Sequence, residues 1–110
     1  MHGSGMASAT SICEALRRTL SGEGSEIKRL GDAALLLHDR LGVAVDFCEI
    51  LGGRWSHISG HPGLLTPLHR IHLSPRRGML AGEIPAEIRP EWEAVVECLR
   101  RAMTSTSFGG

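Results

Sequence analysis

Aromatic residues, cysteines and long hydrophobic runs are all scarce in this chain of 110 residues. It has no tyrosine and an aromatic content of only 4%, so a nucleic-acid surface built from several stacking rings is not indicated. No segment approaches the roughly 20 apolar residues of a membrane-spanning helix, and we expect no membrane partner. A hydrophobic content of 42% and a charged content of 22% are typical of a globular domain.

The cysteine count is odd, and no C-x-x-C pair occurs among Cys13, Cys48 and Cys98. A secreted disulfide scaffold would carry more cysteines, in an even number. We therefore expect reduced thiols and a cytoplasmic location. The length fits a single domain, expected over residues 10–103, with a leader at 1–9 and a flexible tail at 104–110.

Acidic residues are missing from the middle of the chain. The net charge is zero, yet no Asp or Glu lies between Leu51 and Gly82, and the four arginines of this segment give it a charge of +4. The remaining residues carry a charge of −4. The same segment contains most of the histidines, namely His57, His61, His69 and His72.

Three helices are predicted from capping residues and apolar periodicity. Ser11 is expected to cap the first, which ends near Gly22. Ser25 precedes the second, and Gly42 is a natural C-terminal stop. The third spans 90–103, with a proline at its start, glutamates in its first turn and arginines near its end, as the helix dipole favours.

Four residues of the second helix predict its contacts. Gly31 and His38 fall on its apolar side, where a small residue lets another element approach and a histidine is expected in the core with one hydrogen bond. Leu35 and Leu36 offer a second apolar surface, on which the chain is expected to form a homodimer.

The middle of the chain predicts strands. Residues 43–50 are rich in β-branched side chains, and the glycines at 52–53 are a two-residue hairpin signal. Further strands are expected over 54–59, 69–73 and 79–83. This order predicts an α+β fold, a small antiparallel sheet of about four strands with two N-terminal helices and one C-terminal helix packed on one face.

One alternative changes both fold and function. The spacing of Leu37, residues 41–43, Cys48 and Leu51 resembles that of a helix-turn-helix DNA-binding unit. The resemblance implies a recognition helix over 44–51. However, this helix would turn carboxylates toward the phosphates, which repel them, and its valines favour a strand.

The acid-free segment predicts the binding surface. Guanidinium groups bind phosphates and carboxylates through paired hydrogen bonds, and imidazoles gain charge below about pH 6.5. We expect a non-catalytic binding or regulatory module that holds an acidic protein surface, a nucleic acid or a phosphorylated ligand. The predicted binding residues are Arg54, Trp55, His57, Arg70, His72, Arg76 and Arg77. In the alternative interpretation, the arginines pair with the acidic helices of the same chain, of which the third carries Glu91, Glu93 and Glu97.

Two other chemistries are open. No cofactor is expected, but a zinc-binding domain is an alternative in which the ligands would be His57, His61, His69 and His72. Their spacing is a weak signal, because residues 69 and 72 would point to opposite faces of a strand. A Cys/His enzyme is the remaining alternative, with Cys48 as nucleophile, His57 as base and Asp46 orienting that base.

Overall fold

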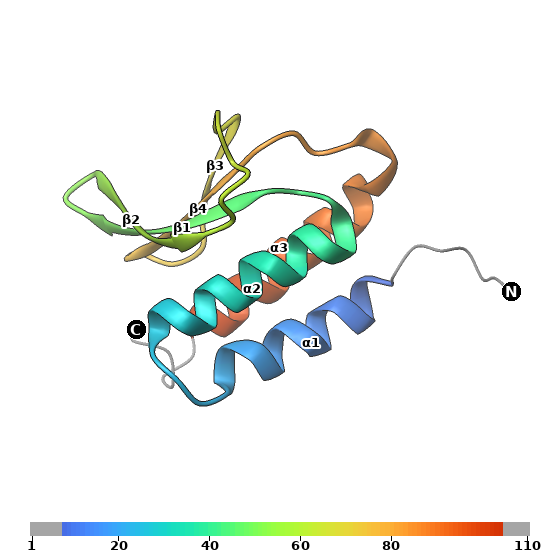
Figure 1. Cartoon of the computed structure of the whole chain (residues 1–110), viewed down its shortest axis with the longest axis horizontal. Helices are drawn as coiled ribbons and strands as arrows, with labels where there is room; N and C mark the ends of the chain where they lie inside the picture. The colour runs from blue at the N-terminus through green and yellow to red at the C-terminus, as the bar shows by residue number, and fades with distance from the viewer. Residues whose placement is uncertain (1–7, 105–110) are drawn as a thin grey trace, which may run out of the picture.

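The computed structural model describes residues 8–104 and contains a four-stranded sheet with three helices on one side of it (Figure 1). Two helices precede the strands and one follows them, which confirms the predicted α+β architecture. Most of the expected leader and nearly all of the expected tail lie outside the described residues.

The first helix, α1, spans Ala9–Ser21. Its N-cap is Ser8, whose hydroxyl accepts a hydrogen bond of 3.2 Å from the backbone N–H of Ser11. The prediction that Ser11 is the cap is therefore wrong. Ser8 provides the same capping chemistry three residues earlier, and the helix gains a further turn.

The second helix, α2, spans Glu26–Leu41 and has the predicted ends. The Ser25 hydroxyl accepts a hydrogen bond of 3.1 Å from Lys28 N–H. Gly42 adopts the left-handed conformation with φ 73°, and its N–H donates to the His38 carbonyl at 2.8 Å. Glycine adopts this conformation without the steric cost that a Cβ would bring.

The third helix, α3, spans Arg89–Thr104 and follows a short 3-10 turn, η1, at Ala86–Ile88. A disulfide joins Cys98 of α3 to Cys13 of α1. The expectation of reduced thiols is therefore wrong for these two residues, and Cys48 is the free, buried cysteine. The odd count favoured reduced thiols, but two of three cysteines can still pair when packing brings their helices together.

The strands are β1 at Val45–Leu51, β2 at Arg54–Gly60, β3 at His69–His72 and β4 at Arg77–Ala81. They form a fully antiparallel sheet in the order β2-β1-β4-β3. The predicted hairpin between β1 and β2 is confirmed. Its glycines, Gly52 and Gly53, have φ angles of 57° and 83°, as a type I′ turn requires.

The helices form two layers beneath the sheet. Figure 1 shows α2 and α3 directly under the strands and α1 below them, on the side away from the sheet. One apolar core fills the space between these layers. Its largest fully buried members come from β1, β4 and all three helices: Phe47, Met79, Leu30, Leu37, Leu99, Met103, Ile12, Leu16 and Leu20.

The helix-turn-helix alternative is wrong, because the expected recognition helix over 44–51 is strand β1 from Val45 onward. Val45 and Phe47 face the helices and are buried, as alternation along a strand requires. Within the described part of the chain, no helix has both the length and the apolar character needed to cross a membrane.

Candidate functional site

Several of the predicted binding residues lie together on the side of the sheet that faces away from the helices, which we call the outer face. The strand register pairs Phe47 with Met79 and Met79 with Ile71 on the helix side. Because side chains alternate between the two faces of a sheet, their neighbours in sequence lie on the outer face. This places Arg70 and His72 there from β3.

The edge strand β2 contributes Trp55 and His57 to the same face, since they pair with Ile50 and Cys48 of β1. The outer face thus unites residues from both edges of the sheet, and its members among the predicted residues are Trp55, His57, Arg70 and His72.

Trp55 is the centre of this face. Its indole reaches from β2 across β1 to β4, where it fills the space above Gly78. The Arg70 guanidinium carbon lies 5.0 Å from the centre of the ring, a distance typical of a cation–π contact. The His72 ring meets the indole edge-on at 5.0 Å between centroids. One tryptophan therefore connects β2 to Arg70 and His72 of β3.

A carboxylate also lies on this face. Asp46 Oδ1 is 2.6 Å from His57 Nδ1, and Asp46 Oδ2 accepts a hydrogen bond of 3.7 Å from Cys48 Sγ. Asp46 and Cys48 therefore share the outer face of β1. Burial, followed by the nearby Asp46 carboxylate, raises the pKa of the Cys48 thiol to about 11, and Arg70 lowers it only in part. The thiol is therefore protonated at neutral pH and poorly suited to nucleophilic attack.

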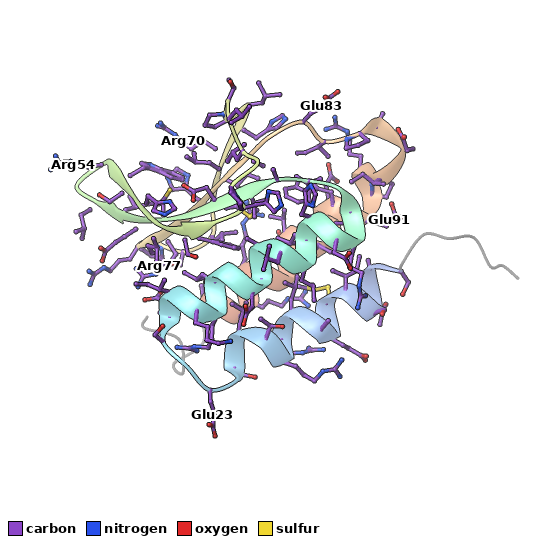
Figure 2. The ribbon with its side chains drawn as sticks, viewed as in Figure 1. Glu23, Arg54, Arg70, Arg77, Glu83 and Glu91 are labelled. Carbon is purple, nitrogen blue, oxygen red and sulfur yellow. A yellow bond between two sulfur atoms is a disulfide. The ribbon has the colours of Figure 1, made fainter. Side chains whose placement is uncertain are left out.

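The remaining predicted arginines are placed differently. Figure 2 shows Arg54 at the tip of the β1–β2 hairpin and Arg77 on the helix side of the sheet. Arg77 donates two hydrogen bonds, of 2.6 and 2.9 Å, to the Glu26 carboxylate. These bonds, reinforced by the charges of Glu26 and Glu49, outweigh the opposing effect of burial and raise the pKa of Arg77. Arg76 lies 2.9 Å from a Glu49 oxygen.

Two of the predicted arginines are thus neutralised by the chain itself. Arg77 pairs with an acidic residue of a helix, Glu26 of α2, as the alternative interpretation expected, whereas Arg76 pairs with Glu49 of strand β1. Neither pairs with the third helix, which that interpretation had emphasised. Arg54 and Arg70 are exposed and have no carboxylate partner within residues 8–104. Among the predicted binding arginines, these two are the ones whose charge a partner can reach.

The histidines of the zinc alternative point to different surroundings. His57 contacts Asp46, and His72 contacts Trp55. His61 stacks on His38 with 3.9 Å between ring centroids, and its Nδ1 accepts a hydrogen bond of 2.9 Å from the backbone of Gly63. No group of three or more metal-ligating side chains occurs in the described part of the chain, so the residues present do not assemble the four-histidine site.

The stacked pair also corrects an expectation about α2. His38 is exposed and lies against another imidazole, so the prediction of a core histidine is wrong. The helical stripe indicated which side of α2 the residue occupies. It could not show that the loop after β2 would bring a second histidine to this position.

A groove of about 650 Å³ between β3 and α3 is a feature that sequence reasoning missed. Its apolar lining comes from Leu68, Ile71, Ile84, Trp92 and Val96, and charged side chains of α3 also border it. His69 and Arg70 lie along its β3 side. No local signal identifies the groove, because it forms only when the edge strand and the last helix pack side by side.

Comparison with protein-family models, curated proteins and solved structures found no match to this chain. Its function has to be inferred from the chemistry of the outer face and the groove.

Proposed function

We propose that this protein is a small non-catalytic binding module that holds an anionic partner on the outer face of its sheet. The observation that supports this most directly is the state of Arg70. It is exposed, it lies over the Trp55 ring at 5.0 Å, and it has no carboxylate partner within residues 8–104. A guanidinium held against an aromatic ring keeps its N–H donors available for an incoming carboxylate or phosphate.

The neighbours of Arg70 support the same function. The His57 imidazole is held on this face by its contact with Asp46 Oδ1 at 2.6 Å. His72 adds imidazole donors beside the ring, and Arg54 adds a positive charge at the hairpin tip. Arg76 and Arg77 lie outside the proposed contact surface, because Glu49 and Glu26 bind them.

Titrations with three anionic probes test this proposal: polyglutamate, single-stranded oligothymidylate and inorganic phosphate. We expect at least one to bind, and its affinity to fall between about 50 and 300 mM salt, because screening weakens contacts between exposed charges. Arg70→Glu should weaken binding by about tenfold or more. Arg17→Glu is the matched control, since Arg17 is an exposed arginine on α1 with the same charge. Failure of all three probes to bind, or unchanged binding by Arg70→Glu, would contradict the proposal.

Two finer expectations are part of the proposal. A homodimer would use α2, where Leu35 is 54% exposed while Leu36 packs partly against the core. Light scattering on the wild type and on Leu35→Glu tests this.

A cytoplasmic location was predicted from reduced thiols. The disulfide between Cys13 and Cys98 is instead typical of an oxidising compartment, so the location is a prediction to be tested. Trapping of thiols in intact cells measures which state the protein has there.

A further inference from the structure

Among residues 8–104, the hydrogen-bond pattern of the sheet leaves some backbone groups of the edge strand β3 without a strand partner. Gly82 N–H donates to Ala44 O and Ile50 N–H donates to Arg76 O, each at 2.9 Å. In an antiparallel pair, residues that exchange hydrogen bonds alternate with residues that do not. Gly78 and Leu80 of β4 therefore bond to β1, and the alternate residues Arg77, Met79 and Ala81 bond to the β3 side.

The same alternation continues into β3. Leu73 N–H donates to Arg77 O at 2.9 Å, so the β3 residue that bonds to β4 at Met79 is Ile71. Arg70 and His72 must then direct their N–H and C=O groups away from the sheet. The His72 carbonyl agrees with this direction, because it accepts a hydrogen bond of 3.0 Å from Arg100 Nε of α3.

The groove lies directly beside this open edge. The side chain of Ile71 points into it, and Trp92 and Val96 of α3 form its opposite wall. A strand added next to β3 would send every second side chain into this apolar groove and the others to the outer face beside Arg70 and His72. Backbone hydrogen bonds would provide affinity, and the two sets of side chains would provide specificity.

We propose that β3 binds an extended segment of a partner protein in which acidic side chains alternate with apolar ones. This inference rests on the proposed function, because the acidic side chains are the anions that would meet Arg70. The chemistry of the two surfaces also sets the register. Arg89 and Arg100 border the groove beside Glu93 and Glu97, so the charges of α3 balance there and the apolar lining favours apolar side chains. The outer face, with the unpaired charge of Arg70, attracts acidic ones. An apolar-in, acidic-out arrangement satisfies both surfaces.

Arg100 limits what the edge can accept. It covers the His72 carbonyl and also pairs with Glu97 at 2.7 Å. The incoming strand therefore pairs with the N–H and C=O of Arg70 and the N–H of His72. A charged side chain over part of an edge also disfavours indiscriminate pairing with other strands.

Two capped peptides of about eight residues, a normal strand length, test the inference. One alternates glutamate with leucine and valine, and the other contains the same residues in an acidic block followed by an apolar block. We expect the alternating peptide to bind about tenfold tighter or more. N-methylation of one alternate set of its amides should abolish binding, and methylation of the other set should leave it unchanged. In antiparallel addition, the residue opposite Arg70 exchanges hydrogen bonds with it and has its side chain on the same outer face, so the bonded amides are those of the glutamates. Loss of binding on methylation of the glutamate amides would therefore identify antiparallel addition.

A matched pair of variants locates the site. Leu68 lines the groove and is 59% exposed, whereas Leu65 is 89% exposed and does not line it. Leu68→Glu should weaken the alternating peptide about fivefold or more, with Leu65→Glu unchanged. Equal affinity for the two peptides, no binding of either, or insensitivity to both methylated sets would overturn strand addition. The proposed function would still stand if Arg70→Glu weakened the binding of the simple anionic probes.

Discussion

The indole of Trp55 occupies the space that a side chain at position 78 would need, because a Cβ on Gly78 would overlap the ring. The glycine is one of the outer-face residues of β4, between the strand that carries Trp55 and the strand that carries Arg70. The position of the ring, and with it the contact to Arg70, therefore depends on the absence of a side chain in a neighbouring strand.

Gly78→Ala should lower the free energy of unfolding by about 1–3 kcal/mol, the usual cost of forcing extra volume into a packed site. In a Trp55→Ala background the same substitution should cost little, because the ring that it displaces is gone. Urea denaturation of the two single variants and the double variant measures this coupling. An equal cost of Gly78→Ala in both backgrounds would show that the ring does not occupy this space.

The neighbouring arginines Arg76 and Arg77 should differ in their contribution to stability. The Arg77 side chain is 12% exposed and binds Glu26 through two hydrogen bonds, whereas that of Arg76 is 57% exposed with a single contact to Glu49. Arg77→Met should cost about 1–3 kcal/mol, since it leaves a partly buried carboxylate without its partner. Arg76→Met should cost about 0–1 kcal/mol, as exposed ion pairs do.

A second change separates loss of the ion pair from loss of packing at Arg77. In the double variant Glu26→Gln/Arg77→Met no unpaired carboxylate is left, so part of the stability should return, as thermal denaturation can show. If Arg76→Met and Arg77→Met cost the same, the bidentate pair has no special role in holding α2 to the sheet.

The elements that local chemistry controls could be predicted from the sequence. The second helix has a serine cap and a glycine stop, and the hairpin has two glycines that accept positive φ. Gly31 was expected to allow a close approach, and a Cβ there would lie 2.9 Å from Ser59 Oγ of β2. Each of these signals involves residues adjacent in sequence or on one helical face.

The candidate site could be predicted only in part, because its contacts depend on strand order. Trp55 and Arg70 meet only because β1 and β4 lie between their strands and Gly78 has no side chain. The partner of Arg77 is Glu26, 51 positions away on another element. The acid-free segment indicated which residues carry positive charge, but it could not show which of them the fold neutralises.

The disulfide between Cys13 and Cys98 should account for a large share of the stability. It joins residues 85 positions apart, and closing a loop of that length reduces the entropy of the unfolded chain by an amount worth about 4–5 kcal/mol. Reductant should therefore lower the urea midpoint of the wild type to that of Cys13→Ser/Cys98→Ser, and it should leave the double variant unchanged. Wild-type stability that is insensitive to reductant would show that the two thiols are not joined in solution.

Cys48 should react slowly with thiol reagents in the folded protein. Its pKa of about 11, raised first by burial and then by Asp46, leaves little thiolate at neutral pH, and only the thiolate attacks. Reaction with an aromatic disulfide reagent at pH 7.5 should be far slower in buffer than in denaturant, and Asp46→Asn should speed it moderately, because burial remains. Rapid labelling of the folded wild type would restore the enzyme alternative.

The raised pKa of Cys48 should also make the stability of the protein fall at high pH. The folded state keeps the Cys48 proton up to about pH 11, whereas the unfolded chain loses it near its ordinary pKa of 9.0. The unfolded state thus binds fewer protons between these values, and the free energy of unfolding must fall as the pH rises through that window. Cys48→Ala removes the titrating group, so its stability should decline less over the same range. Parallel pH profiles for the two proteins, measured by urea denaturation, would show that the thiol ionises equally in the folded and unfolded states.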